Sequence, residues 1–196
     1  MKSISPIIYE QSGPIAHITL NRPDALNAID EALPSALEAA VIRANANESI
    51  RVIILSGAGR AFCAGYDLNV FAESPGTNPG IQEMPWDPVK DFAFMKRNTD
   101  CFMSLWRSLV PVICKVHGYA IAGGSDIALC ADLLVVADNA QLGYPPAQGM
   151  GVSDNSDVGL SPWCGAGETL AIQRRLDRWG PGGSLGSGAG CARGRS

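Results

Sequence analysis

The chain has 196 residues, 46% of them hydrophobic, a mean hydropathy of +0.09 and a formal net charge of −4. It is long enough for one domain with a substantial core, and the acidic balance, with no basic run in the first 157 residues, argues against a nucleic-acid surface. No apolar run approaches the roughly 20 residues of a membrane span, and the N-terminus has no secretion signal, so we expect a cytoplasmic protein.

The six cysteines show neither a CxxC pair nor a cluster with histidine. They are Cys63, Cys101, Cys114, Cys130, Cys164 and Cys191. This scatter favours reduced, buried thiols over a zinc site or a disulfide framework, and no metal or redox cofactor is indicated.

The N-terminal part predicts a hairpin, a helix and a strand. Residues 7–10 and 15–20 are β-rich runs separated by Ser12-Gly13-Pro14. A helix is expected to begin near Asp30, followed by a strand over 51–56 whose four consecutive apolar residues predict cover on both faces. The apolar residues at helical spacing are Leu33, Leu37, Val41 and Ala44.

Glycine turns follow this strand, and residues 57–68 lead from turn to helix start. Residues 74–88 hold four prolines and read as a surface loop. A long helix is predicted over 89–109, and one of its faces is expected to belong to the core. The residues of that face are Phe92, Met95, Phe102, Trp106 and Leu109.

The stretch from His117 to Asp132 organises the rest of the chain. It follows a predicted strand at 112–116, and Gly123-Gly124 opens a helix. Backbone N–H groups at a helix N-terminus lack partners within the helix and carry partial positive charge, so they bind an anion or a polarised carbonyl oxygen. Asp126, one turn further on, is either a helix cap or an acid/base group, and the residues alone do not decide between them.

Residues 133–137 predict another buried strand, and the composition changes after about residue 152. Residues 161–196 hold nine glycines, five arginines and no lysine. Within them only 170–179 is predicted to form a short helix, and most of 180–196 is expected to be disordered. We therefore divide the chain into a core, residues 1–152, and a Gly/Arg-rich tail, residues 153–196.

Three segments in this order resemble the crotonase superfamily, also called the enoyl-CoA hydratase/isomerase family. The first is Asn21-Arg22-Pro23 with Ala25-Leu26-Asn27-Ala28, the second runs from Gly59 to Leu68, and the third from His117 to Asp132. The resemblance covers roughly residues 5–152. It implies an α/β fold, a superhelix of ββα units, whose C-terminal helical part is missing or altered here.

The resemblance also implies a site for an acyl-CoA thioester, with coenzyme A as part of the substrate and no separate cofactor. The backbone N–H groups of Tyr66 and Gly123 match the family's oxyanion-hole donors, which stabilise a thioester enolate. Asp126 matches a family acid/base position. The residues expected to line the substrate are Ala25, Leu26, Ala64, Asp67, Leu68, Asn69 and Tyr144.

Two departures from the family pattern bear on the reaction. Hydratases of this family use two glutamates, which align with Asp126 and Pro146, and proline cannot move a proton. A standard two-glutamate hydratase is therefore disfavoured, and isomerase, lyase or related enolate chemistry with Asp126 is expected. His117 and Asp132 are expected to be structural.

The family's later helices complete the acyl pocket and drive assembly into trimers or hexamers, whereas here the expected pattern stops near Gly151-Val152. We hypothesise that the last forty or so residues are read out of frame, because such composition is typical of a shifted frame in GC-rich DNA. The alternative to an enzyme is a catalytically impaired CoA-binding paralogue or a truncated inactive product.

Overall fold

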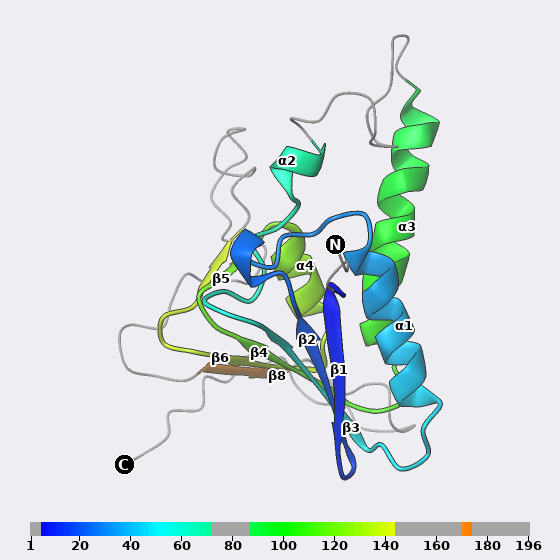
Figure 1. Ribbon diagram of the computed structural model, residues 1–196, viewed down its shortest axis with the longest axis vertical. Coiled ribbons are helices and arrows are strands. Elements are labelled where there is room, and N and C mark those ends of the chain that lie inside the picture. The colour runs from blue at the N-terminus through cyan, green and yellow to red at the C-terminus, as the bar shows by residue number, and fades with distance from the viewer. Residues whose placement is uncertain (1–4, 72–86, 144–169, 174–196) are drawn as a thin grey trace, which may run out of the picture.

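The computed structural model describes residues 5–71, 87–143 and 170–173 (Figure 1). The strands are β1 (Ile7–Ser12), β2 (Ile15–Leu20), β3 (Val52–Gly57), β4 (Val112–Val116), β5 (Tyr119–Ile121), β6 (Leu133–Val136), β7 (Gln141–Gly143) and β8 (Leu170–Gln173). The helices are the 3-10 turn η1 (Pro23–Ala25) and the α-helices α1 (Leu33–Asn45), α2 (Leu68–Phe71), α3 (Pro88–Trp106) and α4 (Gly123–Leu129).

The main sheet has the strand order β1-β2-β3-β4-β6-β8. β1 and β2 form the predicted antiparallel hairpin, with Ser12 paired to Ile15. The strands from β2 through β3 and β4 to β6 are parallel, so each connection must cross over to the same end of the sheet. α1, α3 and α4 lie in these crossovers, as the alternation of strand and helix patterns predicts.

A second, shorter row of extended segments runs beside the main sheet. β5 pairs in parallel with β7, and isolated parallel bridges join Cys63 to Ala120 and Ile29 to Tyr66. The chain thus repeats a unit of three parts: a strand in the main sheet, an extended segment in the second row, and a helix. The units β4-β5-α4 and β3-(63–66)-α2 follow this rule, which agrees with the expected ββα fold.

The core lies between the main sheet and the pair α1 and α3, which pack side by side (Figure 1). Ile18, Leu20, Ile53 and Leu55 from the strands and Leu37 from α1 have no exposed surface. Such burial stabilises each side chain by about 1.5–3 kcal/mol relative to exposure. The apolar spacing that predicted α1 is confirmed, although the helix begins at Leu33 rather than near Asp30.

The expectation that strands 51–56 and 133–137 are covered on both faces is wrong for the described structure. In β3 fully buried residues alternate with half-buried Val52 and Ile54, and in β6 Val135 is 37% exposed. A run of apolar residues allows burial on both faces, but cover depends on what packs against the sheet.

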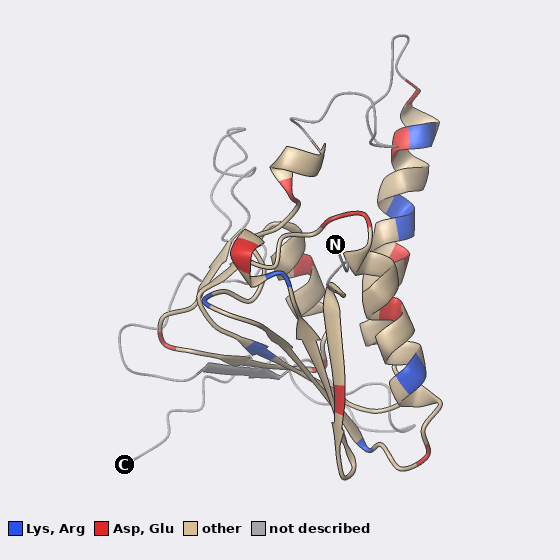
Figure 2. Ribbon diagram, viewed as in Figure 1, with Lys and Arg blue, Asp and Glu red and all other residues tan. Residues whose placement is uncertain are grey.

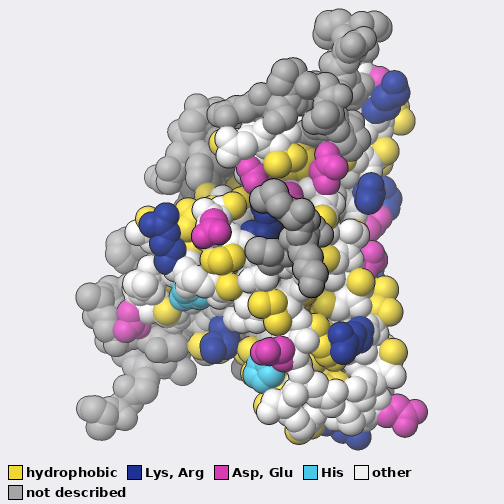
Figure 3. Space-filling model, in the orientation of Figure 1, with side chains coloured by type: hydrophobic (Ala, Val, Ile, Leu, Met, Phe, Trp, Pro, Cys, Tyr) yellow, Lys and Arg dark blue, Asp and Glu magenta, His cyan; other side chains and the backbone are white. Residues whose placement is uncertain are grey.

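The prediction of which face of the long helix belongs to the core is also wrong. Of the predicted residues only Phe102 is buried, whereas Phe92 is 66% and Leu109 69% exposed, and Met95 and Trp106 are exposed as well. The buried residues of α3 are Asn98, Cys101, Phe102 and Leu105. α1 sets this face, because it lies against the second half of α3, and the first turns of α3 extend beyond it (Figure 1). Figure 3 shows hydrophobic side chains among charged ones along this edge of the molecule.

Part of the stretch predicted as a short helix, residues 170–179, is instead the strand β8. It pairs antiparallel with β6, from Val136–Leu170 to Leu133–Gln173. A sheet edge offers hydrogen bonds that override a weak helical pattern. The loop over residues 74–86, Tyr144, Pro146 and the rest of the Gly/Arg-rich tail lie outside the described residues. No helix within the described part has the length and apolarity to span a bilayer.

Two glycines allow the turns after β3 and β4 to lie in direct backbone contact. A Cβ on Gly124 would overlap the carbonyl oxygen of Cys63, and a Cβ on Gly118 would overlap that of Arg60. Gly118 also has a φ of +57°, which glycine adopts without strain. The turns can therefore approach each other only without side chains at these positions.

We predict that Gly124→Ala lowers the free energy of unfolding by about 3 kcal/mol or more, because the obstructing atoms are backbone and cannot rotate away. Gly143→Ala is the control: among the described residues its added Cβ would meet Ile121 Cδ1 at 3.8 Å, an ordinary contact. Urea unfolding of both variants tests this. Equal stability of the two would contradict the interlocked turns.

Candidate functional site

Backbone hydrogen bonds join the two glycine turns that the sequence singles out. They run from Phe62 N to His117 O (2.9 Å), from Cys63 N to Tyr119 O (2.8 Å) and from Ile121 N to Cys63 O (3.0 Å). The turns therefore form one unit, and the two predicted oxyanion-hole residues belong to it.

Tyr66 and Gly123 are neighbours in space. A Cβ placed on Gly123 would lie 2.9 Å from Tyr66 Cε2 and 2.8 Å from Ile29 Cδ1. The aromatic ring thus packs against the Gly123 backbone, which leaves no room for a side chain at that position. The structure thus brings together two residues 57 positions apart in the chain, whose N–H groups the sequence predicts as donors.

The direction of the Tyr66 N–H group follows from its peptide. The Gly65 carbonyl oxygen, which belongs to the same peptide unit, accepts a hydrogen bond from Ile29 N at 2.8 Å. A trans peptide is planar, with its C=O and N–H pointing in opposite directions. The Tyr66 N–H therefore points away from Ile29.

The same reasoning applies to Gly123. The Ala122 carbonyl accepts from Ser125 N at 2.8 Å and from Asp126 N at 3.1 Å, so it points into α4. The Gly123 N–H, on the opposite side of that peptide, points out of the helix N-terminus. Ala122 has φ 48° and ψ −119°, a conformation that strains a residue with a Cβ. Backbone strain thus lies directly beside the predicted donor.

Asp126 lies in the first turn of α4, and its carboxylate is partly exposed. Ala122 holds the N-cap position without a side-chain cap hydrogen bond, and no described residue donates a hydrogen bond to the Asp126 carboxylate. Although the side chain reaches solvent, the protein around it removes enough water to raise the pKa of the carboxyl group. The capping alternative has no hydrogen bond to support it.

Of the predicted substrate-lining residues, Leu26 and Ala64 are joined directly. Ala64 N donates to Leu26 O at 3.0 Å, and both residues and Ala25 are half-buried. Leu26 has φ 52° and Asn27 has φ 56°, so the chain turns sharply here. This places the segment after η1 beside the first glycine turn.

Asp67, Leu68 and Asn69 begin α2. Asp67 is only 8% exposed and accepts a hydrogen bond from Asn69 N at 3.2 Å, which is the geometry of a helix cap. Leu68 is 66% exposed, and Asn69 is exposed. Tyr144 lies outside the described residues, so its place at the site stays a prediction.

His117 and Asp132 have structural partners, as expected. A His117 ring nitrogen donates to Gly59 O at 2.9 Å. The Asp132 carboxylate accepts from Val112 N at 2.8 Å, and Asp132 N donates to Val112 O at 3.0 Å. His117 thus ties the two glycine turns, and Asp132 ties the end of α4 to β4.

Sequence reasoning gave no role to Arg22 and Asn27, although both lie in the first motif. The Asn27 side chain is fully buried, accepts from Arg22 N at 2.8 Å and donates to Ala58 O and Ala61 O, each at 2.8 Å. The Arg22 side chain pairs with Asp67. The motif itself was the available signal, but its partners Ala58, Ala61 and Asp67 are 31 to 45 residues away in sequence.

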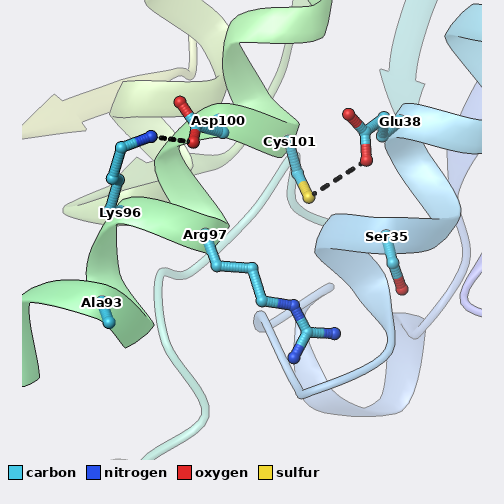
Figure 4. Close-up of a pocket in the computed structure, with 7 residues that line it drawn as sticks. All are labelled: Ser35, Glu38, Ala93, Lys96, Arg97, Asp100 and Cys101. Atoms are coloured by element: carbon cyan, nitrogen blue, oxygen red, sulfur yellow. Dashed lines mark hydrogen bonds and ion pairs between the residues drawn. The ribbon is translucent and has the colours of Figure 1, made fainter. Parts of the chain in front are cut away.

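A surface pocket of about 490 Å³ lies elsewhere, between α1 and α3 (Figure 4). Its lining carries two acidic and two basic side chains, of which Lys96 pairs with Asp100, and Glu38 accepts a hydrogen bond from Cys101 Sγ at 3.4 Å. Figure 2 shows acidic and basic residues along α3. Burial, helped by Glu38, raises the pKa of the Cys101 thiol to about 11, so the thiol is a poor nucleophile. The pocket contains none of the predicted site residues.

Burial likewise raises the pKa of the Cys63 thiol to about 11 and shifts that of Cys114 upward. The described cysteines form no disulfide, and Cys164 and Cys191 lie outside the described residues. Within the described ranges, no group of three or more His, Cys, Asp or Glu side chains is placed to hold a metal ion.

Comparisons with known proteins show the family of this chain. The family model for enoyl-CoA hydratase/isomerase matches residues 10–160. (E)-Benzylidenesuccinyl-CoA hydratase of Thauera aromatica is 34% identical over 172 residues, 87% of this chain and 58% of the relative. Carnitinyl-CoA dehydratase of Proteus mirabilis (strain HI4320) is 34% identical over 86% of this chain and 63% of that protein.

A crystal structure of enoyl-CoA hydratase from Mycobacterium smegmatis is also similar, with a TM-score of 0.66 and 38% identity. The match covers 74% of this chain and 51% of that chain. The chain therefore spans between about half and two thirds of the length of these proteins.

We predict that Asn27→Asp lowers the free energy of unfolding by about 2–4 kcal/mol at neutral pH. Aspartate keeps the size of asparagine and its tolerance of positive φ, but it cannot donate to the Ala58 and Ala61 carbonyls. Asn47→Asp is the matched control, because Asn47 is only half-buried and its side-chain hydrogen bonds are exposed, and it should cost less than about 1 kcal/mol. Urea unfolding measures both, and equal losses would contradict the role of Asn27.

The raised pKa of Asp126 predicts a pH-dependent stability. Between its ordinary value of 3.8 and the higher folded-state value, the folded chain binds more protons than the unfolded chain, so its stability falls as pH rises. Asp126→Asn removes this dependence. Relative to the variant, the parent should therefore lose stability as pH rises through that window, with a constant difference above it. Urea unfolding of both proteins from about pH 3 to 8 measures this, and a pH-independent difference would contradict it.

Proposed function

The chain belongs to the enoyl-CoA hydratase/isomerase family, the crotonase superfamily, and we propose that it binds an acyl-CoA thioester and stabilises its enolate. The observation that carries this proposal is the contact between Tyr66 and Gly123. The carbonyls of the preceding residues, Gly65 and Ala122, accept backbone hydrogen bonds, which fixes both peptide planes. Their N–H groups are then fixed in direction before any ligand arrives.

The chemistry of an enolate supports two such donors. When a proton leaves the α-carbon of a thioester, negative charge moves to the carbonyl oxygen. N–H groups that are already oriented stabilise that charge without rearrangement, and losing one such donor typically costs about 10²–10³ in rate. The donors are backbone groups, so they are independent of the side chains at 66 and 123.

Asp126 is proposed as the acid/base group. It follows Gly123 by three residues, in the first turn of the helix whose N-terminus carries one donor. Its raised pKa makes the carboxylate a stronger base than an ordinary aspartate. With Pro146 in place of the second glutamate, we favour proton transfer at a single carboxylate, as in an isomerase or lyase, over standard two-glutamate hydration.

The substrate class is supported by relatives whose names include CoA hydratase and CoA dehydratase. We further propose that Ala25, Leu26, Ala64 and the start of α2 line the thioester, that no separate cofactor is needed, and that the protein works in the cytoplasm. Assembly into a trimer or hexamer, as in the family, is also a proposal. A catalytically impaired CoA-binding paralogue is the second candidate, and Pro146 favours it.

The test is calorimetric binding of CoA and a panel of acyl-CoAs, followed by turnover, on this chain at a known oligomeric state. We expect thioesters to bind about tenfold more tightly than free CoA, and Asp126→Asn to lower turnover about 10²–10⁴-fold while thioester binding is retained. Binding without turnover in the parent would favour the impaired paralogue. No preference for thioesters in a folded chain would reject the oxyanion hole.

A further inference from the structure

We propose that Arg22 is a positioning residue: its side chain holds the Gly65–Tyr66 peptide and so directs the Tyr66 N–H toward the substrate oxygen. This inference rests on the proposed function, and it assigns a role to a residue that does not itself contact the reacting atoms.

The guanidinium group of Arg22 connects three points on two separate segments. Nε lies 3.1 Å from Asp30 Oδ2, and Nη2 lies 2.9 Å from Asp67 Oδ2. Nη1 donates to the Ala28 carbonyl oxygen. One planar group therefore ties the segment 28–30 to the residue that follows Tyr66.

Backbone hydrogen bonds between the same two segments bracket Tyr66. Ile29 N donates to Gly65 O at 2.8 Å, and Asp67 N donates to Ile29 O at 3.0 Å. The first of these fixes the peptide plane that carries the Tyr66 N–H. This bridge is isolated and not part of a longer ladder, and the other hydrogen bonds between the segments, such as that from Ala64 N to Leu26 O, lie before Gly65. The Arg22 side chain adds contacts at Ala28, Asp30 and Asp67, on both sides of the bridge.

Arginine suits this position better than lysine. The Arg22 side chain is 24% exposed, and its planar fork reaches two carboxylates and a carbonyl at once. Lysine has a single ammonium group and cannot match these directions. The Arg22 backbone is held separately, since its N–H donates to Asn27. Removing the side chain should therefore loosen the Tyr66 peptide without unfolding the loop.

The test compares Arg22→Met and Arg22→Lys with the parent and with Arg51→Met. Arg51 is a matched control, because its guanidinium donates to the Glu48 and Ile50 carbonyls at an exposed site outside the glycine turns. Butyryl-CoA with a ¹³C label at the carbonyl is the probe. Its infrared carbonyl stretch reports polarisation by the oxyanion hole, and calorimetry gives its affinity relative to CoA.

We expect the parent and Arg51→Met to lower the carbonyl stretch equally. Arg22→Met should lose most of that lowering and about tenfold of the preference for butyryl-CoA over CoA, while affinity for CoA stays within about twofold. For Arg22→Lys we expect a carbonyl shift and a preference for butyryl-CoA between those of the parent and those of Arg22→Met. An unchanged carbonyl shift in Arg22→Met would overturn the proposal.

Amide hydrogen exchange separates this inference from the proposed function. In Arg22→Met the Ile29 and Asp67 amides should exchange faster, whereas the Ile53 amide, which donates to Pro111 O in the main sheet, should not change. If the parent protein does not lower the carbonyl stretch of the probe, the proposed oxyanion hole is wrong. The hydrogen-exchange result then tests by itself whether Arg22 holds the Gly65–Tyr66 peptide. If Arg22→Met unfolds, Arg22→Lys takes its place, and unchanged exchange in it overturns the proposal.

Discussion

The structure depends on the direct backbone contact between the turns after β3 and β4. A carbon atom on Gly124 or Gly118 would occupy the space of the carbonyl oxygens of Cys63 and Arg60. Because no side chain intervenes, the turns form hydrogen bonds directly between their backbone N–H and C=O groups. β5 pairs with the first turn at Cys63 and also with β7. The contact that packs two ββα units together is therefore the same one that brings Tyr66 to Gly123. Packing and site geometry cannot vary independently here.

Peptide planarity converts this packing into chemistry. The Gly65 carbonyl is held by Ile29, and the Ala122 carbonyl is held inside α4, so the N–H on the other side of each peptide has a defined direction. Ala122, which carries this carbonyl, has a strained backbone conformation. Such strain is found mostly at functional sites. In the proposed oxyanion hole, such fixed donors would need no reorganisation when charge develops on the substrate oxygen.

Local patterns predicted the hairpin, the strands β3, β4 and β6, α1 and the helix that opens at Gly123, because each depends on periodicity and turn residues within a few positions. The inward face of α3 could not be predicted, since Phe92 and Met95 are as apolar as Phe102 and only the position of α1 decides which is covered. β8 replaced an expected helix because the edge of β6 was not visible in the local pattern. The long-range contacts of Arg22 and Asn27, to Asp67, Ala58 and Ala61, span 31 to 45 residues, beyond the reach of any motif spacing.

Asp126 illustrates how opposing electrostatic effects select a base. Its place in the first turn of α4 favours the ionised carboxylate, because the helix N-terminus is positive. Loss of water around the side chain favours the neutral acid and raises the pKa of the carboxyl group. With no described residue donating a hydrogen bond to it, the carboxylate keeps its basicity. A single carboxylate of this kind can take a proton from an α-carbon whose thioester oxygen is held by fixed N–H groups, and then return it elsewhere, whereas adding water calls for a second acid/base group. This is the physical reason for the proposal that a single carboxylate, Asp126, transfers a proton within a bound acyl group.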